Sequence, residues 1–297
     1  MEAVPRPPVY LSPSGAEDVR EDHMNEAMDG NRRNWDERVP IHAASRFYDV
    51  DGFKAGRSTL MSIELDEMDD VRGKSLLHLQ CHFGMDTMSW ARMGANVTGV
   101  DFSEAAIDLA RSLSDELDNP ARFVTSNIYD LPEALDEPRQ FDVVYTSYGV
   151  LVWLPDLPRW ARVIAHFLKP GGTFYIIDDH PVRNIFGPEN DGGLSVRHPY
   201  FRYGEPLVFK PDEQGTYTYT DGDTPLETTA HEWSHSMGEI VSSLAAAGLT
   251  IEFLHEFPLN GWQAFPQMVR GEDGWWRLPE HNDSIPQLFS IKAHKPG

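Results

Sequence analysis

The sequence predicts an α/β fold in which seven strands form a doubly wound sheet. Between residues 75 and 179, short apolar runs alternate with amphipathic stretches, as in βαβ units. A helix pattern and two more strand patterns follow after residue 235. With 297 residues, 40% of them hydrophobic, the chain can also bury a core of the size that such a sheet needs.

The segment before the sheet has two parts. Residues 1–24 are rich in Pro, Ser and acidic residues without a helical or strand period, which predicts a mobile arm. Residues 25–70 carry aromatic and apolar residues at irregular helical spacing, so we expect short helices that form an N-terminal helical cover.

The core of the predicted sheet spans residues 71–179. Apolar runs predict its strands at residues 75–80, 96–100, 122–126, 141–147 and 173–178. Helices are expected between them at residues 86–93, 104–117 and 157–168. Ser103 is placed to cap the second helix, and the Lys169-Pro170-Gly171-Gly172 run ends the third.

Residues 180–235 interrupt this alternation with Pro, Gly and aromatic residues, and the Tyr217-Thr218-Tyr219-Thr220 run is typical of an exposed strand. Insertions of this length usually carry a lid or a binding surface, so we expect a lid between the fifth strand and the following helix. Residues 236–297 then complete the sheet with a helix at 236–247 and strands at 249–257 and 288–293.

The charge balance limits the partners of the chain. Lys and Arg number 25 against 47 Asp and Glu, a formal net charge of −22, which disfavours nucleic acid and anionic membranes. Cys81 is the single cysteine, which fits a reducing compartment, and the sequence has neither a secretory leader nor an apolar span of membrane length. We therefore expect a cytoplasmic protein, and leave open whether it forms a homodimer.

The first strand leads through a tight turn ending at Gly84 into a helix. Such a turn lets the backbone approach a ligand and directs the helix N-terminus into the crevice beyond the strand. Asp101 follows Gly84 by 17 residues, at the end of the second strand. A carboxylate there is placed to accept hydrogen bonds from both hydroxyls of a ribose, so the two features together predict an adenosine site.

These motifs resemble those of the class I S-adenosylmethionine-dependent methyltransferases, which have a Rossmann-like sheet. The resemblance covers residues 75–179 closely and the last two strands loosely. Five segments carry it in order: the turn ending at Gly84, Gly99-Val100-Asp101-Phe102-Ser103, Asn127-Ile128-Tyr129-Asp130-Leu131-Pro132, Phe141-Asp142-Val143-Val144 and Leu168-Lys169-Pro170-Gly171-Gly172. It implies S-adenosyl-L-methionine as the cofactor and methyl transfer as the activity.

The sequence departs from the family pattern at three positions of the first motif. His78 stands where the family usually has an acid, and Gln80 and His82 stand at the first and second glycine positions. A neutral imidazole and an amide can still hydrogen-bond the ammonium or carboxylate of the methionine half. We therefore expect His78, Gln80, His82 and Gly84 to contact the cofactor.

Carried over by position, the resemblance implies that Asp101 holds the ribose and that Phe102 packs near the adenine. Asn127 and Ile128 would frame the adenine edge, and Tyr148 would lie beside the methyl donor. Each assignment has a structural alternative, because Phe102 and Ile128 could be ordinary core residues and Asn127 could form a turn. The assignment of Asp101 is the firmest, because a carboxylate directly after a buried strand needs a partner.

Methyl transfer from a sulfonium requires alignment of the acceptor and exclusion of water. Trp35 and Tyr48 of the cover are candidates to close over the cofactor, although the cover and the insertion could simply pack together. Tyr148 and Trp153 are the first candidates for contact with the acceptor. His180, and after it His235, could remove a proton from the acceptor, although either could be structural.

Three rival functions remain open at this stage. The His231-Glu232-Trp233-Ser234-His235 run matches the zinc-protease motif, but a capping pattern starting at Ser236 places His231 before the helix, so no metal site is expected. A nicotinamide-dependent oxidoreductase would need a G-x-G-x-x-G turn, of which this sequence supplies Gly84. A non-catalytic binding protein could retain the same sheet.

The acidic composition favours a small-molecule methyl acceptor over a nucleic acid. Aromatic residues of the insertion and of the C-terminal part could line its pocket, or could form a second small core. They are Tyr200, Phe201, Tyr203, Phe209, Tyr217, Tyr219, Trp262, Trp275 and Trp276.

Overall fold

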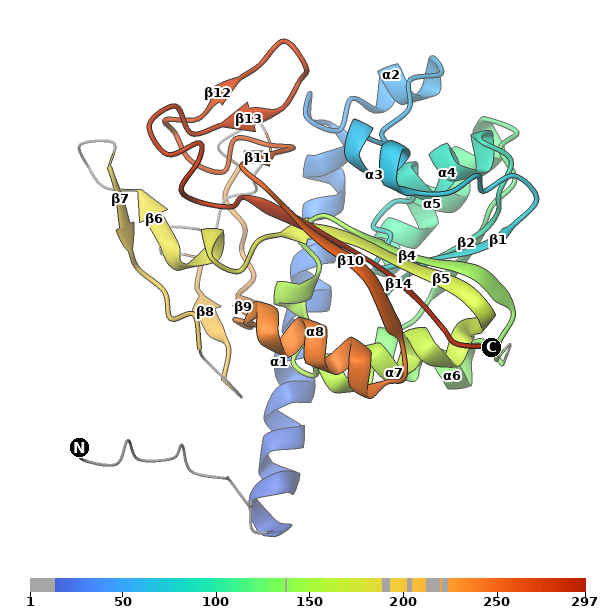
Figure 1. Ribbon diagram of the computed structural model, residues 1–297, viewed down its shortest axis with the longest axis horizontal. Coiled ribbons are helices and arrows are strands. Elements are labelled where there is room, and N and C mark those ends of the chain that lie inside the picture. The colour runs from blue at the N-terminus through green and yellow to red at the C-terminus, as the bar shows by residue number, and fades with distance from the viewer. Residues whose placement is uncertain (1–13, 137, 189–192, 202–204, 212–219, 221–223) are drawn as a thin grey trace.

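A seven-stranded sheet with helices on both faces organises the computed structural model, which describes residues 14–136, 138–188, 193–201, 205–211, 220 and 224–297 (Figure 1). The helices are α1 (Ser14–Ala43), α2 (Val50–Lys54), α3 (Ser62–Glu67), α4 (Met85–Arg92), α5 (Glu104–Glu116), α6 (Leu131–Ala134), α7 (Leu157–Phe167) and α8 (Met237–Ala246). The strands of the sheet are β1 (Ser75–Leu79), β2 (Asn96–Asp101), β3 (Arg122–Thr125), β4 (Phe141–Ser147), β5 (Leu168–Asp179), β10 (Thr250–Phe257) and β14 (Leu288–His294). The predicted fold class is therefore confirmed.

The order of the strands locates the crevice of the fold. Across the sheet the order is β10-β14-β5-β4-β1-β2-β3, and β14 alone runs antiparallel to its neighbours. The chain winds outward from β1 through β2 to β3, and outward on the other side from β4 to β5. Ligands of doubly wound sheets bind where the winding reverses, beyond the carboxyl ends of the strands. Here that point lies between β1 and β4.

The two faces of the sheet bury separate cores. Leu77 and Leu79 of β1 pack with residues of α6, α7 and α8, whereas Leu76 packs with Trp90 of α4 on the other face. This alternation follows from the two-residue period of a strand, which places His78 on the same face as Leu76. Helix α5 continues the second face through Ile107.

The expectation of short helices throughout residues 25–70 is wrong for its first part, because α1 is a single helix of 30 residues. It begins at Ser14, inside the stretch for which the sequence predicts an arm, while residues 1–13 lie outside the described part. Along its length α1 contacts both α5 and β9. Because α1 contacts different elements along its length, it has no single apolar stripe. Its hydrophobic pattern therefore does not predict one long helix.

Helix α1 is hydrogen-bonded to the insertion. Asn31 binds the backbone of His231 in both directions, with the side-chain amide donating to the carbonyl oxygen (2.7 Å) and the side-chain oxygen accepting from the N–H (2.8 Å). Glu37 accepts a hydrogen bond from the Thr228 N–H at 3.1 Å. The N-terminal cover and the end of the insertion are therefore joined.

The described parts of the insertion form two small antiparallel pairs. They are β6 (Phe186–Pro188) with β7 (Leu194–Val196), and β8 (Leu207–Phe209) with β9 (Ala230–Glu232). The strand predicted around Tyr217–Tyr219 lies outside the described residues. A third small sheet, which sequence reasoning missed, joins β11 (Leu259–Asn260), β13 (Trp276–Arg277) and β12 (Val269–Arg270) between β10 and β14.

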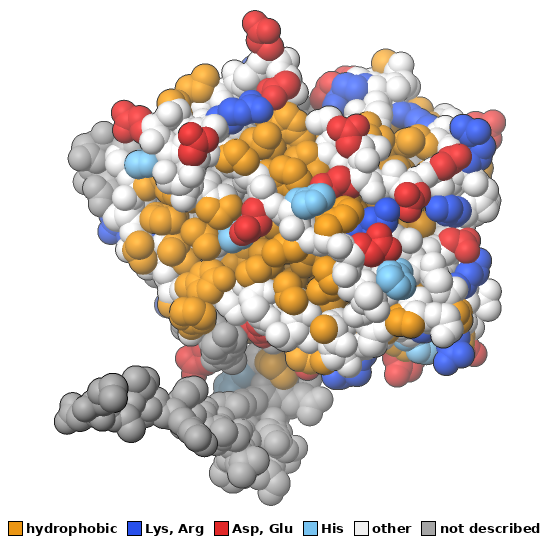
Figure 2. Space-filling view, viewed as in Figure 1, with side chains coloured by type: hydrophobic (Ala, Val, Ile, Leu, Met, Phe, Trp, Pro, Cys, Tyr) orange, Lys and Arg blue, Asp and Glu red, His pale blue; other side chains and the backbone are white. Residues whose placement is uncertain are grey.

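The surface shown in Figure 2 carries an apolar area among scattered acidic and basic side chains. Val196, Phe201 and Val269 are among the most exposed apolar residues of the described chain, at 67%, 70% and 58% of their full surface. In the described part of the chain, no helix is both long and apolar enough to cross a membrane.

Candidate cofactor site

The turn after β1 has the backbone of a glycine-rich loop without most of its glycines. Gln80, His82 and Gly84 have φ values of 58°, 50° and 73°, in the left-handed region that favours glycine. At position 84 glycine is required, because a Cβ would lie 2.4 Å from Cε1 of Phe123. Gln80 and His82 therefore occupy the glycine positions of the motif at a cost in backbone strain, which proteins tolerate mainly at functional sites.

Two polar atoms of this turn are available to a ligand. The Gln80 amide donates to the carbonyl oxygen of Val150 (3.1 Å), but its Oε1 is buried and has no partner among the described residues. The Nδ1 atom of His82 is likewise buried and unpaired in the described chain, while its Nε2 lies 3.0 Å from Nδ1 of His42. Unsatisfied buried polar atoms are uncommon, so both fit a site that a polar ligand completes.

Asp101 ends β2 and faces the same turn. Its carboxylate accepts hydrogen bonds from the backbone N–H groups of His82 (2.8 Å) and Ser103 (2.9 Å). Burial raises the pKa of Asp101 to about 6, although these hydrogen bonds oppose the rise. An ionised carboxylate offers about four acceptor positions, so two remain for a ribose diol. The geometry fits the predicted role without testing it.

The residues expected around the adenine lie in the loops after β2 and β3, where each also packs in the core or caps a helix. Phe102 is half-buried and packs against the core below α7, and Ile128 is buried in that core. The side chain of Asn127 accepts a hydrogen bond from the Tyr129 N–H at 3.0 Å, which makes it the cap of a short 3-10 helix. Contact of these three residues with adenine stays a prediction.

The N-terminal cover lies over the turn, and Trp35 is central to it. Its ring lies 5.1 Å from the His82 ring and 5.3 Å from the Trp153 ring, centroid to centroid, so it bridges the loops after β1 and β4. Tyr48 packs 4.8 Å from Phe83. The structure thus brings both predicted cover residues to the crevice.

Asp36, which sequence reasoning missed, fastens this cover to the core. Its carboxylate accepts hydrogen bonds from the Ser103 hydroxyl (2.7 Å) and from the Ala105 N–H (3.3 Å) at the start of α5. A carboxylate at a helix N-terminus is favoured by the helix dipole. Helix α1 is therefore held beside the strand end that carries Asp101.

The turn after β4 is shaped by a buried carboxylate of the next strand. Tyr148 and Gly149 have φ values of 46° and 77°, and Asp178 accepts hydrogen bonds from the N–H groups of Gly149, Val150 and Leu151. Burial, and then the neighbouring Asp179, raise the pKa of Asp178 to about 7. Asp178 therefore positions the turn on which Tyr148 lies, a role that its place at the end of an apolar run could have suggested.

The Tyr148 hydroxyl donates to Oε2 of Glu64 at 2.7 Å. Glu64 lies in α3, is fully buried, and accepts a second hydrogen bond from the Met61 N–H at 2.7 Å. Burial raises the pKa of Glu64 to about 8. Glu64 thus holds the phenol expected beside the methyl donor, and no pattern in the sequence distinguishes it.

The two histidines expected to act as a general base have both ring nitrogens engaged. Nε2 of His180 lies 2.7 Å from Glu256, and its Nδ1 accepts a hydrogen bond from the Val182 N–H at 3.0 Å. His235 donates from Nε2 to the Leu154 carbonyl oxygen at 2.7 Å, and its Nδ1 lies 3.3 Å from the Glu239 carboxylate. These bonds argue against the predicted role, because accepting a proton from a substrate would require breaking one of them.

The zinc-protease pattern does not form a helix. His231 lies in β9, and Ser236 caps α8 by accepting a hydrogen bond from the Glu239 N–H at 3.1 Å, as predicted. His231 and His235 therefore both precede α8 and do not lie one helical turn apart. Among the described residues, no group of three or more His, Cys, Asp or Glu side chains is arranged to hold a metal ion.

The aromatic residues expected to line an acceptor pocket are dispersed. Trp275 is buried and donates to the Ser62 hydroxyl (3.1 Å), and Phe201 faces solvent. Trp276 and Phe209 lie in β13 and β8, and the hydroxyl of Tyr200 accepts a hydrogen bond from the Met237 N–H at 3.1 Å. Tyr203, Tyr217 and Tyr219 lie outside the described residues.

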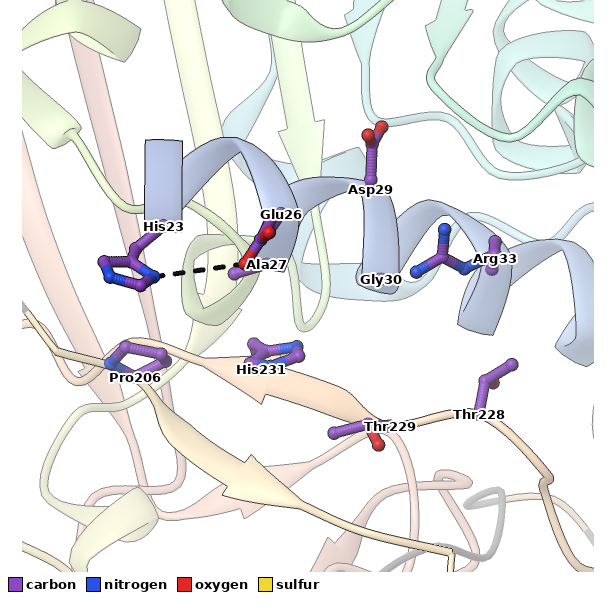
Figure 3. A pocket seen from close by; sticks show the side chains of 10 residues that line it. All are labelled: His23, Glu26, Ala27, Asp29, Gly30, Arg33, Pro206, Thr228, Thr229 and His231. Carbon is purple, nitrogen blue, oxygen red and sulfur yellow. Dashed lines mark ion pairs between the residues drawn. The ribbon is translucent and has the colours of Figure 1, made fainter. Parts of the chain in front are cut away.

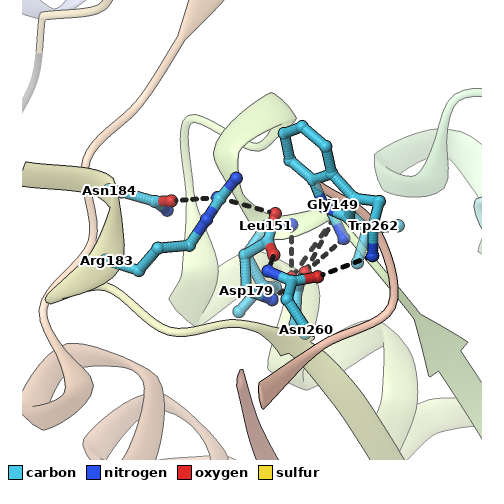
Figure 4. A network of polar contacts seen from close by, with 9 residues as sticks. Gly149, Leu151, Asp179, Arg183, Asn184, Asn260 and Trp262 are labelled. Carbon is cyan, nitrogen blue, oxygen red and sulfur yellow. Dashed lines mark hydrogen bonds and ion pairs between the residues drawn. The ribbon is translucent and has the colours of Figure 1, made fainter. Parts of the chain in front are cut away.

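Trp262 is the exception, because it borders the crevice. The Arg183 guanidinium lies 4.7 Å from its ring and pairs with Asp179 at 2.9 Å. Figure 4 shows this group beside Gly149 and Leu151 of the turn after β4. The group therefore lies at the carboxyl end of β5, next to the turn that carries Tyr148.

One hollow of the described surface lies away from the crevice. A depression of about 800 Å³ lies between α1 and β9 and is lined by polar side chains, among them His23, Asp29, Arg33 and His231 (Figure 3). None of the residues expected to bind the cofactor lines it. At the crevice, Trp35 lies between the loops after β1 and β4.

Known proteins share the sequence and the fold. A family model for a methyltransferase domain matches residues 77–174. A ubiquinone biosynthesis O-methyltransferase from Xanthomonas euvesicatoria is 30% identical over 198 residues, which cover 66% of this chain and 76% of that protein. A crystal structure from Mesorhizobium loti, described as an S-adenosylmethionine-dependent methyltransferase, is 22% identical with a TM-score of 0.53, over 78% of this chain and 96% of that one. A crystal structure from Listeria monocytogenes described in similar terms is 18% identical with a TM-score of 0.55, over the same shares of the two chains.

Proposed function

The chain belongs to the class I S-adenosylmethionine-dependent methyltransferases, and we propose that it methylates a small-molecule acceptor by direct in-line transfer. The similarity to O-methyltransferases favours an oxygen atom as the acceptor. The net charge of −22 disfavours a nucleic acid. S-adenosyl-L-methionine, when bound, supplies a methyl group that its sulfonium already activates.

The observation that carries this proposal is the arrangement of Asp101 opposite the turn after β1. The carboxylate keeps acceptor capacity for a ribose diol, and Gln80 Oε1 and His82 Nδ1 of the same turn have no partner among the described residues. Asp101 would hold the ribose, and Gln80 would accept a hydrogen bond from the methionine half.

The side chains of this protein would position the methyl acceptor and exclude water from the reacting atoms. Trp35 closes the crevice from the side of α1, which would shield the reacting atoms from solvent. Tyr148 and Trp153, on the turn after β4, would contact the acceptor. His180 and His235 are left without a catalytic role because their ring nitrogens are engaged.

Calorimetric titration with S-adenosylhomocysteine tests the proposal. Wild type should bind this product, and should not bind NAD, which would separate it from a nicotinamide-dependent oxidoreductase. Asp101→Ala should weaken binding about a hundredfold or more, because two hydrogen bonds to a charged acceptor are lost. Asp115→Ala, which removes an exposed carboxylate of α5, serves as the control. Absence of binding by wild type, or undiminished binding by Asp101→Ala, would refute the assignment.

A further inference from the structure

Asp86 occupies an unusual place for an acid in the first turn of a helix. Its carboxylate accepts a hydrogen bond from the Ser147 hydroxyl at the end of β4 (3.2 Å), and the Thr59 side chain lies close enough to favour its ionised form. The side chain is only half-buried, so solvent reaches it. Asp86 therefore faces the space between the ends of β1 and β4, where doubly wound sheets bind ligands.

His78, which replaces the acid of the family on β1, cannot supply a negative charge there. Its ring is buried, with Nδ1 2.8 Å from the Thr87 hydroxyl and Nε2 3.4 Å from the Ser147 hydroxyl. Burial lowers the pKa of His78 to about 3, so the ring is neutral near pH 7. The charge that the family places on the strand is thus missing at that position, and Ser147 connects the position to Asp86.

Polar atoms around this space lack partners. Among the described residues, no Lys, Arg or His forms an ion pair with Asp86. Oε1 of Gln80 is buried and has no partner among the described residues. A ligand with several hydrogen-bond donors and a positive charge would satisfy this set.

Asp86 lies near a second buried acid, Glu64. Glu64, which also lies near it, has a pKa raised to about 8 by burial and is therefore protonated at neutral pH. Burial raises the pKa of Asp86 as well, but the hydrogen bonds from Thr59 and Ser147 favour its ionised form. An ammonium group beside the Asp86 carboxylate would favour the ionised form of that carboxylate.

We propose that Asp86 binds the ammonium group of the methionine half of the cofactor, in place of the acid that the family carries at the position of His78. Asp86, at the start of α4, would then supply the carboxylate that β1 lacks at His78. The Ser147 hydroxyl lies between the two side chains. Gln80 would accept a further hydrogen bond from the same ammonium. This inference rests on the proposed function, because it requires the cofactor to lie in the crevice between β1 and β4.

The test compares two ligands that differ in the amino-acid tail. S-adenosylhomocysteine carries the ammonium group, whereas 5′-methylthioadenosine has the same adenosine and sulfur without the tail. By calorimetry at pH 7, Asp86→Asn should weaken S-adenosylhomocysteine about ten- to a hundredfold, as expected for loss of a charge-assisted hydrogen bond. Binding of 5′-methylthioadenosine should not change. Asp115→Asn removes the same charge from the exposed face of α5 and should change neither affinity.

Three outcomes would overturn the inference. Asp86→Asn could bind S-adenosylhomocysteine as tightly as wild type, or it could lose affinity for both ligands equally, which would indicate a general effect on the crevice. Failure of Asp86→Asn to fold, seen in a thermal melt, would assign the carboxylate to structure instead. Failure of wild type to bind either ligand would refute the proposed function itself, so the two failures are distinguishable.

Discussion

Buried Glu64 gives the protein a specific dependence of stability on pH. Its pKa is about 8 in the folded chain against an ordinary value of 4.5, because burial disfavours its ionised form. Between these values the unfolded chain releases the proton while the folded chain keeps it, so stability falls as pH rises. The loss is complete above pH 8 and absent below pH 4.5. A shift of about 3.5 pH units corresponds to about 5 kcal/mol of unfolding free energy.

Glu64→Gln should remove this dependence. The amide oxygen can still accept from the Met61 N–H, and the amide group can donate to the Tyr148 hydroxyl, so both hydrogen bonds have a replacement. We expect wild type and variant to be similar near pH 5. By pH 9 the variant should be more stable by up to about 5 kcal/mol.

Urea unfolding of both proteins at pH 5, 7 and 9 measures this difference. Because other buried acids also titrate, the informative quantity is the variant minus wild type, in which their contributions cancel. Glu280→Gln, at an exposed position, controls for the change in net charge. A difference that stays flat from pH 5 to pH 9 would refute the account of Glu64 as a buried, protonated acid.

Three further predictions follow from other contacts. Gly84→Ala should lower the unfolding free energy by about 2–4 kcal/mol in urea, because the new Cβ meets Phe123 at a positive φ; an unchanged midpoint would contradict the close approach. Trp35→Ala should release S-adenosylhomocysteine faster in stopped-flow displacement, since the ring bridges the two loops over the crevice; an equal rate would remove Trp35 from the cover. The neutral ring of His78, with a pKa of about 3 against 6.5, stabilises the fold above pH 6.5 and loses this effect as pH falls toward 3. His78→Asn should therefore lose less stability than wild type between pH 6.5 and 4, measured by tryptophan fluorescence in urea.

The centre of the sheet was predictable because its strands β1, β2, β4 and β5 are mostly buried and therefore carry apolar runs. Both faces of β1 are covered, so its residues are apolar on both faces apart from Ser75 and His78, and the predicted bounds of β4 are those observed. The turn after β1 was also predictable in part. Gln80 and His82, assigned to glycine positions, do adopt positive φ, because the backbone path of the motif is kept while its residue types change.

The residues that the sequence did not indicate act through contacts between distant segments. Asp36 reaches Ser103 across 67 positions, and Glu64 reaches Tyr148 across 84. The hydrophobic periodicity of a local segment cannot predict contacts between residues so far apart in the sequence. The partners of the His180 and His235 ring nitrogens were unpredictable for the same reason, since residue type suggests proton transfer but the neighbouring residues decide which nitrogen atom is free.

Because α1 is bonded to α5 through Asp36 and to the insertion through Asn31 and Glu37, the two substrates should not arrive independently. Moving the helix to admit the nucleotide also moves the segment next to which an acceptor would dock. We expect a compulsory sequence of arrival, nucleotide before acceptor. Product inhibition by S-adenosylhomocysteine would then be competitive with the methyl donor alone.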